Sequence, residues 1–202
     1  KSGEVVLTEI DAGDVADYTC YVSGTCGDVL SEVASLSLKP ETEITEQPED
    51  AIICEGESHT FTVSAEGANL SYQWMYNEDD IDGENSAGLT IDNAEVSDAG
   101  EYRCVVTGDC GEVLSDPVDL TVHTLTEINS QPSLATVCPG DDHTFTVTAE
   151  GSNLSYQWKK DGSDITGQNA NTLELTGIDS GDAGDYTCLV SGECGNVLSD
   201  IA

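Results

Sequence analysis

The chain has 202 residues, of which 40 are Asp or Glu and only 5 are Lys or Arg, so its formal net charge is −35. Charge this one-sided argues against nucleic acid and anionic membranes as partners, because both reward clustered Lys and Arg. No apolar run approaches the ~18 residues that a membrane span requires. We therefore expect a solvated acidic surface, with no nucleic-acid partner and no membrane insertion.

A repeat of 84 residues organises the chain. Cys-x5-Cys pairs recur in register at positions 20 and 26, 104 and 110, and 188 and 194, and each pair is preceded by a Tyr two residues before its first Cys. A fixed period predicts an array of one unit. We expect residues 1–38 to be the C-terminal part of a repeat, 39–122 a complete repeat, and 123–202 a nearly complete repeat that lacks the end of its last strand. The chain is then expected to be a piece of a longer one.

Short segments with alternating apolar and polar residues make up the complete repeat. In chain order they predict strands over 43–48, 51–54, 59–65, 70–75, 89–91, 101–107 and 112–122, with a hairpin loop at 108–111. Pro48 permits only an edge strand at the first of these. No segment of any length has helical periodicity, so an all-β sandwich is predicted. The inward positions of these strands predict the core, which includes Val63, Trp74 and Tyr102 and, one period later, Val147, Trp158 and Tyr186.

The connection between repeats is short. Residues 120–128 run from the last strand of one repeat into the first strand of the next without Gly or Ser. Flexible linkers are rich in those residues, so this junction is predicted to be stiff. Stiff junctions at a constant spacing predict a rod-like array.

These residues resemble a known family. The spacing Gly56-x4-Phe61, Trp74 and the segment Asp98-Ala-Gly-Glu-Tyr-Arg-Cys104 are similar to the immunoglobulin-like domain, in which a Tyr two residues before an inward Cys forms a tyrosine corner. The third copy repeats the pattern, and the first keeps only 14–20. The combination of Cys-x-Gly, Tyr-Gln-Trp and Gly-x-Cys-Gly resembles immunoglobulin-like repeats of giant secreted bacterial surface proteins, often adhesins. The resemblance implies tandem immunoglobulin-like β-sandwiches in an extracellular, cell-surface protein.

One departure from that family concerns its inter-sheet disulfide. The resemblance implies a Cys partner for Cys104 on the second strand, but Val63 stands there, and Val147 stands in the next copy. The bridge of antibody-type domains is therefore expected to be missing. Three cysteines are then expected to be buried free thiols that pack as small apolar groups: Cys20, Cys104 and Cys188.

The other cysteines are candidates for disulfides between repeats. Eight Cys without a Cys-x-x-Cys pair suggest an oxidising compartment. The resemblance places Cys54 near the C-terminal pole of its domain and Cys110 at the opposite pole. A strand of six residues spans ~20 Å, whereas bridged Cα atoms lie within ~7 Å. We hypothesise a Cys54–Cys194 bridge, with Cys138 reaching the following repeat and Cys110 the preceding one; Cys26 is a further candidate. Pairing of Cys54 with Cys110, or of Cys104 with Cys110, remains an alternative.

An acidic loop is the only weak candidate for a metal site. Asp79, Asp80, Asp82 and Glu84 offer oxygen ligands of the kind that calcium prefers. The third copy keeps only Asp161 and Asp164, which favours a solvated loop instead. No other cofactor is expected.

No catalytic set recurs in both copies, so we do not expect an enzyme. The favoured function is structural: a stiff stalk or filament of a large cell-surface adhesin, whose partners are neighbouring repeats and, with cations, laterally associated chains. One alternative is a module that recognises a surface glycan or protein through its loops, with Tyr21 and Tyr76 as aromatics to examine. Another is an accessory region that tethers an enzyme elsewhere in the chain.

Overall fold

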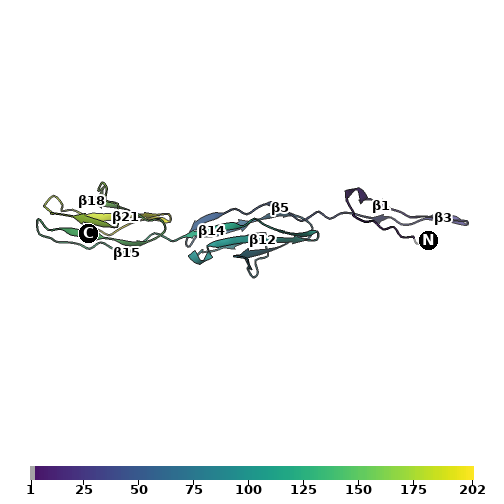
Figure 1. Cartoon of the computed structure of the whole chain (residues 1–202), viewed down its shortest axis with the longest axis horizontal. Helices are drawn as coiled ribbons and strands as arrows, with labels where there is room; N and C mark the ends of the chain where they lie inside the picture. The colour runs from purple at the N-terminus through teal and green to yellow at the C-terminus, as the bar shows by residue number, and fades with distance from the viewer. Residues whose placement is uncertain (1–2) are drawn as a thin grey trace.

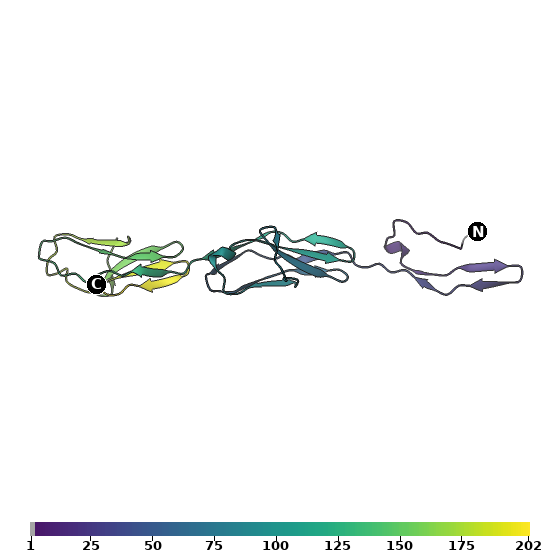
Figure 2. The same ribbon diagram turned by 90° about the horizontal axis from the view of Figure 1, so that it is seen from below.

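The computed structural model describes residues 3–202 and has three groups of strands that follow one another along a single long axis (Figures 1 and 2). The fold is all-β, with tandem immunoglobulin-like β-sandwiches in an extended array. The first module contains η1 (Ala12–Asp14), β1 (Asp17–Tyr18), β2 (Tyr21–Gly24), β3 (Gly27–Leu30) and β4 (Ala34–Ser35). Within residues 3–202, no helix is long and apolar enough to cross a membrane.

The second module is a complete sandwich. Its larger sheet has the order β10-β9-β12-β14-β6, with β13 also paired to β12, while β11-β7 and β5-β8 form the opposing layer. Its elements are β5 (Glu43–Glu46), β6 (Ala51–Cys54), β7 (His59–Thr62), β8 (Ser64–Glu66), β9 (Ser71–Tyr76), β10 (Asp79–Asp80), β11 (Gly88–Ile91), η2 (Val96–Asp98), β12 (Gly100–Gly108), β13 (Gly111–Leu114) and β14 (Val118–His123).

Two predicted strands are each divided in the structure. The segment 59–65 breaks at Val63, whose N–H bonds to the Ala87 carbonyl, so β7 pairs with β11 while β8 pairs with β5. The segment 112–122 breaks at 115–117, where Pro117 has no N–H to donate to a ladder. Beyond that break β14 continues the pairing with β12 and also runs parallel to β6.

The third module repeats this plan with β15 (Glu127–Ser130), β16 (His143–Thr146), β17 (Thr148–Glu150), β18 (Ser155–Lys160), β19 (Ser163–Asp164), β20 (Thr172–Leu175), β21 (Tyr186–Gly192) and β22 (Gly195–Leu198). Residues 135–138, the counterpart of β6, form no strand. A groove of about 450 Å³ lies beside them, lined by Val137, Phe145 and Tyr186. In the second module the corresponding place is filled by β14, and here only Ala202 pairs with Tyr186. The groove is therefore a strand position rather than a cavity shaped for a ligand.

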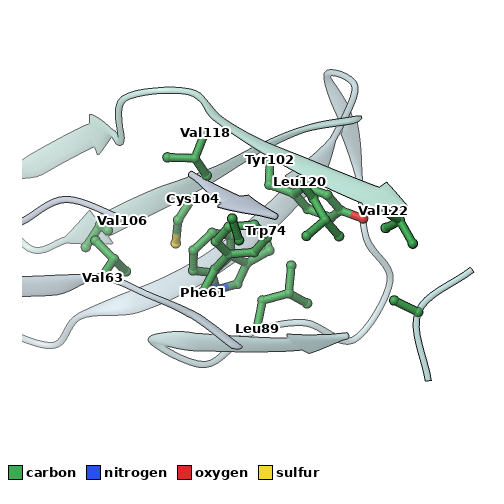
Figure 3. Close-up of a cluster of buried hydrophobic side chains, with 12 residues drawn as sticks. Phe61, Val63, Trp74, Leu89, Tyr102, Cys104, Val106, Val118, Leu120 and Val122 are labelled. Carbon is green, nitrogen blue, oxygen red and sulfur yellow. The ribbon is translucent and has the colours of Figure 1, made fainter. Parts of the chain in front are cut away.

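The core of the second module forms around Trp74 (Figure 3). Trp74 is fully buried, Phe61 packs against it at 6.2 Å between ring centroids, and Tyr102 lies 5.2 Å from Phe61. Val63 and Cys104 complete the same buried set. The third module repeats this core with Phe145, Val147, Trp158, Tyr186 and Cys188.

A tyrosine corner is present in all three modules. The hydroxyls of Tyr18, Tyr102 and Tyr186 donate to carbonyl oxygens four residues earlier, at 2.6, 2.8 and 2.6 Å. Burial, followed by the nearby Asp98 carboxylate, raises the pKa of the Tyr102 phenol because both disfavour the phenolate. The phenol therefore stays a donor and fixes the turn before strand β12.

One of the three thiols expected to be buried is not. Cys104 and Cys188 are fully buried, but Cys20 is exposed. Cys20 has the same hydrogen bond from its N–H to a Ser hydroxyl, here Ser31, that Cys104 makes with Ser115. The described residues of the first module provide no opposing sheet to cover it, as Figure 2 shows. Cys20 is therefore exposed among the described residues, because burial depends on a second layer and not on the strand alone.

Candidate functional site

The junction between the second and third modules contains a disulfide. Cys54 and Cys194 are bonded with Cα atoms 5.6 Å apart, across a sequence separation of 140 residues. Cys54 ends β6 beside His123, the last residue of β14, and Cys194 lies in the hairpin between β21 and β22. The bridge therefore joins the C-terminal pole of one module to the N-terminal pole of the next, and no other disulfide occurs among residues 3–202.

A tight turn presents Cys54 to its partner. The Glu57 N–H donates to the Cys54 carbonyl at 3.0 Å, while the Glu57 carboxylate accepts from the Cys54 N–H at 2.9 Å. Gly56 has a φ of 85°, which favours glycine. Hydrogen bonds between Gly56 and Ala94 and between Glu55 and His123, both 2.8 Å, attach this turn to the rest of the module. The sulfur atom is thus held on a rigid support.

The connecting residues are themselves bonded to the third module. Only residues 124–126 separate β14 from β15. The Thr124 N–H donates to the Ser152 hydroxyl at 3.2 Å, and the Thr126 N–H donates to the Cys194 carbonyl at 3.2 Å. Thr126 is buried against Gly192, where a Cβ atom would collide with the Thr126 hydroxyl oxygen. The linker, the loop at Ser152 and the hairpin at Cys194 therefore form one packed junction.

The junction between the first and second modules has the same plan without a bridge. Thr42 is buried against Gly108 as Thr126 is against Gly192. The Lys39 ammonium pairs with the Asp109 carboxylate at 2.5 Å. Hydrogen bonds from Lys39 and then Asn69 lower the pKa of the Asp109 carboxyl. Here an exposed ion pair joins the linker to the hairpin of the second module, and Cys110 has no disulfide partner within residues 3–202.

Cys110 and Cys138 have the surroundings of the two bridged cysteines. Cys138 begins a turn of the third module that has the geometry of the turn at Cys54. Its N–H bonds to the Asp141 carboxylate at 3.1 Å, and Gly140 has a φ of 92°. Cys110 lies between Gly108 and Gly111, in the hairpin of the second module that corresponds to the hairpin of Cys194 in the third. Both are exposed free thiols, as is Cys26.

The two buried thiols differ chemically from these exposed ones. Burial raises the pKa of the Cys104 thiol to about 11 and also raises that of Cys188, because the thiolate would lose its hydration. Each sulfur makes a long contact with the carbonyl of the next residue, at 3.7 Å for Cys104 and 3.9 Å for Cys188. Val63 and Val147 are buried in the same cores. Cys104 and Cys188 therefore pack as apolar groups and are poor nucleophiles.

The carboxylates of the acidic loop are not gathered into a metal site. Asp79 and Asp80 lie on β10 and are exposed, as is Asp82, while Glu84 is half-buried. Within residues 3–202, no group of three or more His, Cys, Asp or Glu side chains is arranged to hold a metal ion. His59 instead packs edge-on to Phe61 at 4.6 Å, and His143 makes the equivalent contact with Phe145.

The two aromatics named as possible binding residues have different roles. The Tyr76 hydroxyl donates to the carbonyls of Ser97 and Ala99, and its ring packs 5.0 Å from Tyr102. Tyr76 is thus part of the structure of its module. Tyr21 is exposed, and its hydroxyl donates to the Asp28 carboxylate at 2.5 Å, which raises the pKa of the phenol.

The sequence could have revealed one further feature of the junctions. The Gly108–Thr42 and Gly192–Thr126 contacts recur with the 84-residue period, and Gly24 holds the same hairpin position in the first module. A glycine and a threonine repeated at this spacing were a visible signal. Their contact could not be predicted, because it depends on how the linker turns into the next module.

The comparisons with known proteins place the chain in a family. The model of the immunoglobulin domain matches residues 39–107 and 127–191, so the chain belongs to the immunoglobulin domain family. Among curated relatives, the muscle M-line assembly protein unc-89 of Caenorhabditis elegans is 27% identical over 98% of this chain. The receptor-type tyrosine-protein phosphatase S of Gallus gallus is 32% identical over 54% of it. The chain spans only 3% and 8% of these two proteins.

Solved structures show the same array. A titin structure of three immunoglobulin domains has a TM-score of 0.79 and 21% identity, and it covers 94% of this chain and 74% of its own. The insect immune protein hemolin has a TM-score of 0.60 at 18% identity, covering 94% of this chain and 56% of its own. At these identities the likeness concerns the fold. The relatives include both muscle proteins and cell-surface proteins.

Proposed function

We propose that the chain is a mechanical spacer, a stiff segment in the stalk of a large extracellular adhesin. The observation that carries this proposal is the junction between the second and third modules, where a three-residue linker and the Cys54–Cys194 bridge act side by side. Two connections between rigid bodies remove most of the bending that one connection permits. A disulfide also supports an oxidising, extracellular location.

The poles of the modules support a spacer rather than a recognition module. The loop at Ser152 and the hairpin at Cys194 lie at the pole where many immunoglobulin domains expose variable loops, and here they contact the linker. They are thus occupied by the neighbouring module. Attachment to a bacterial surface rests on the motif resemblance, and antibody labelling of intact source cells tests it.

Small-angle scattering tests the spacer directly. The oxidised chain should give an elongated particle whose distance distribution is unchanged from low to moderate salt. A distribution typical of freely jointed beads would reject the spacer.

A second candidate is lateral association of arrays, favoured by a repeated surface feature. Leu30, Leu114 and Leu198 hold the same repeat position and are 61%, 48% and 53% exposed. A net charge of −35 opposes such contact until cations screen it. Sedimentation with and without a divalent cation tests this: association should require the cation and be lost in the paired Leu114→Ser and Leu198→Ser variant. Cation-dependent association that persists in that variant would exclude this surface.

A further inference from the structure

The Cys54–Cys194 bridge makes a covalent shortcut through the array. Two routes connect the N-terminal side of Cys54 with the C-terminal side of Cys194. One follows the backbone through the 140 residue steps between them, and the other crosses the bridge over a Cα–Cα distance of 5.6 Å. A tensile load along the chain is carried by the shorter route, because covalent bonds do not lengthen appreciably under forces that unfold domains.

Most of both modules lies inside the bypassed loop. Strands β7 to β21 belong to it, and with them the buried side chains Trp74 and Trp158. Only β5 and β6 of the second module, and β22 with the residues after it in the third, lie on the loaded route. The parts that would release most length on unfolding are therefore the parts that the load does not reach.

The strands on the loaded route can lengthen only slightly under force. β6 and β22 are already extended, four residues each. β6 pairs in parallel with β14, and β22 pairs with β21, so each loaded strand is attached to a strand inside the protected loop. The load passes from β6 into the bridge at Cys54, the last residue of that strand.

We propose that the bridge is an extension limiter, which passes tensile load from β6 to β22 and keeps most of both sandwiches, strands β7 to β21, out of the load path. This inference rests on the proposed mechanical function only in that the chain must bear tension. It requires neither the stiffness of the junction nor any particular partner.

The size of the effect follows from chain length. The 202-residue chain has 201 residue steps, and removal of the 140 steps inside the loop leaves 61. At about 3.4 Å per step, the fully stretched length falls from about 680 Å to about 210 Å, a roughly threefold reduction.

Single-molecule force spectroscopy tests this on the full chain held by peptide tags at its two ends. A dithiol reductant reduces the Cys54–Cys194 bridge to two thiols and is itself oxidised to a disulfide. The oxidised chain should reach about one third of the stretched length that the reduced chain reaches. The Cys54→Ser variant should reach the full length without reductant. Cys138→Ser is the matched control, since it alters the same turn in the third module, and it should behave as the parent chain does.

Equal stretched lengths before and after reduction would overturn the proposal, and so would a short length that persists in Cys54→Ser. A failure here is distinct from a failure of the spacer. A chain that is jointed in scattering but shortened under load would keep the limiter and lose the stiff stalk. A chain that is elongated in scattering but reaches full length under load would do the reverse.

Discussion

The two junctions of this molecule share a design but differ in what holds them. At each one, a buried Thr of the linker packs against a Gly of the following hairpin. The first junction adds the exposed Lys39–Asp109 ion pair, and the second adds the Cys54–Cys194 bridge. Exposed ion pairs contribute little and weaken with salt, whereas a disulfide resists both salt and acid. One repeated geometry thus yields a junction sensitive to charge and a junction sensitive to reductant.

The largest effect should come from opening the second junction. Cys54→Ser frees a loop of 140 residues, which the chain-entropy account values at up to about 5 kcal/mol. We expect a broader distribution of distances between spin labels on the second and third modules. Cys138→Ser should leave this distribution unchanged. A narrow distribution in Cys54→Ser would mean that the linker contacts alone fix the junction.

The next effect concerns the core thiols, which contrast with the bridged cysteines. The folded-state pKa of Cys104 is raised to about 11, so the unfolded thiol ionises first as the pH rises. The stabilisation is complete below the ordinary thiol pKa and is lost as the pH rises through the folded value. Denaturant unfolding should show the second module losing up to about 3 kcal/mol between pH 8 and pH 11.

Tyr102, whose pKa is also raised, contributes in the same direction, so Cys104→Ala should reduce this slope without removing it. Alkylation of the folded chain checks the same assignment. Cys20, Cys26, Cys110 and Cys138 should react rapidly, while Cys104 and Cys188 should react only on unfolding. Rapid alkylation of Cys104 in the folded chain would contradict its burial.

A smaller effect should follow from filling the glycine position at a junction. Gly192→Ala places a Cβ atom against Thr126 and the Ser152 carbonyl, and overpacking of this kind costs about 1 to 3 kcal/mol. Thermal unfolding of the third module measures this loss, and Gly108→Ala should show the same in the second. Gly24→Ala is the control, because its nearest neighbour lies at 3.5 Å and no linker covers it. Equal losses at all three positions would show that the hairpin, and not the junction, requires glycine.

The smallest effect should appear at the first junction. The pKa of Asp109 is lowered in the folded chain, so the ion pair is fully formed above the ordinary carboxyl pKa and is lost as the pH falls through the folded value. Acid, high salt or Lys39→Ala should therefore increase bending between the first and second modules without a measurable change in melting temperature. NMR relaxation of each module detects this, and the second junction should not respond. A change in melting temperature would show that the ion pair stabilises a module.

The sequence predicted much of this architecture because the alternation of side chains reflects two buried faces. The strand predicted over 70–75, which the structure has at 71–76, and the inward positions of Trp74 and Tyr102 follow from that pattern. It failed at Val63, where the chain changes partner strand, because partner choice is not encoded in local alternation, and at 115–117, where the predicted strand is interrupted. The burial expected for Cys20 stays a prediction, since it requires a second sheet that the described residues of the first module do not provide.

The bridged junction between the second and third modules could be predicted with the help of the repeat. A constant period, together with the two poles that the immunoglobulin-like resemblance implies, makes Cys54 and Cys194 neighbours, and the structure contains that pair. The Lys39–Asp109 contact was not visible in the same way, because 70 residues separate its partners and no copy repeats both charges. Calcium binding by Asp79, Asp80, Asp82 and Glu84 is still a prediction, and calorimetric titration with calcium can decide it.

Peptide mapping of the oxidised chain without reductant tests the covalent junction most directly. Proteases that cleave at acidic residues are suitable, since Asp109 separates Cys104 from Cys110 and acidic residues are frequent throughout. We predict one cross-linked species that joins the peptide of Cys54 to the peptide of Cys194. A species that joins Cys110 to Cys54 or to Cys104 instead would contradict a bridge between modules.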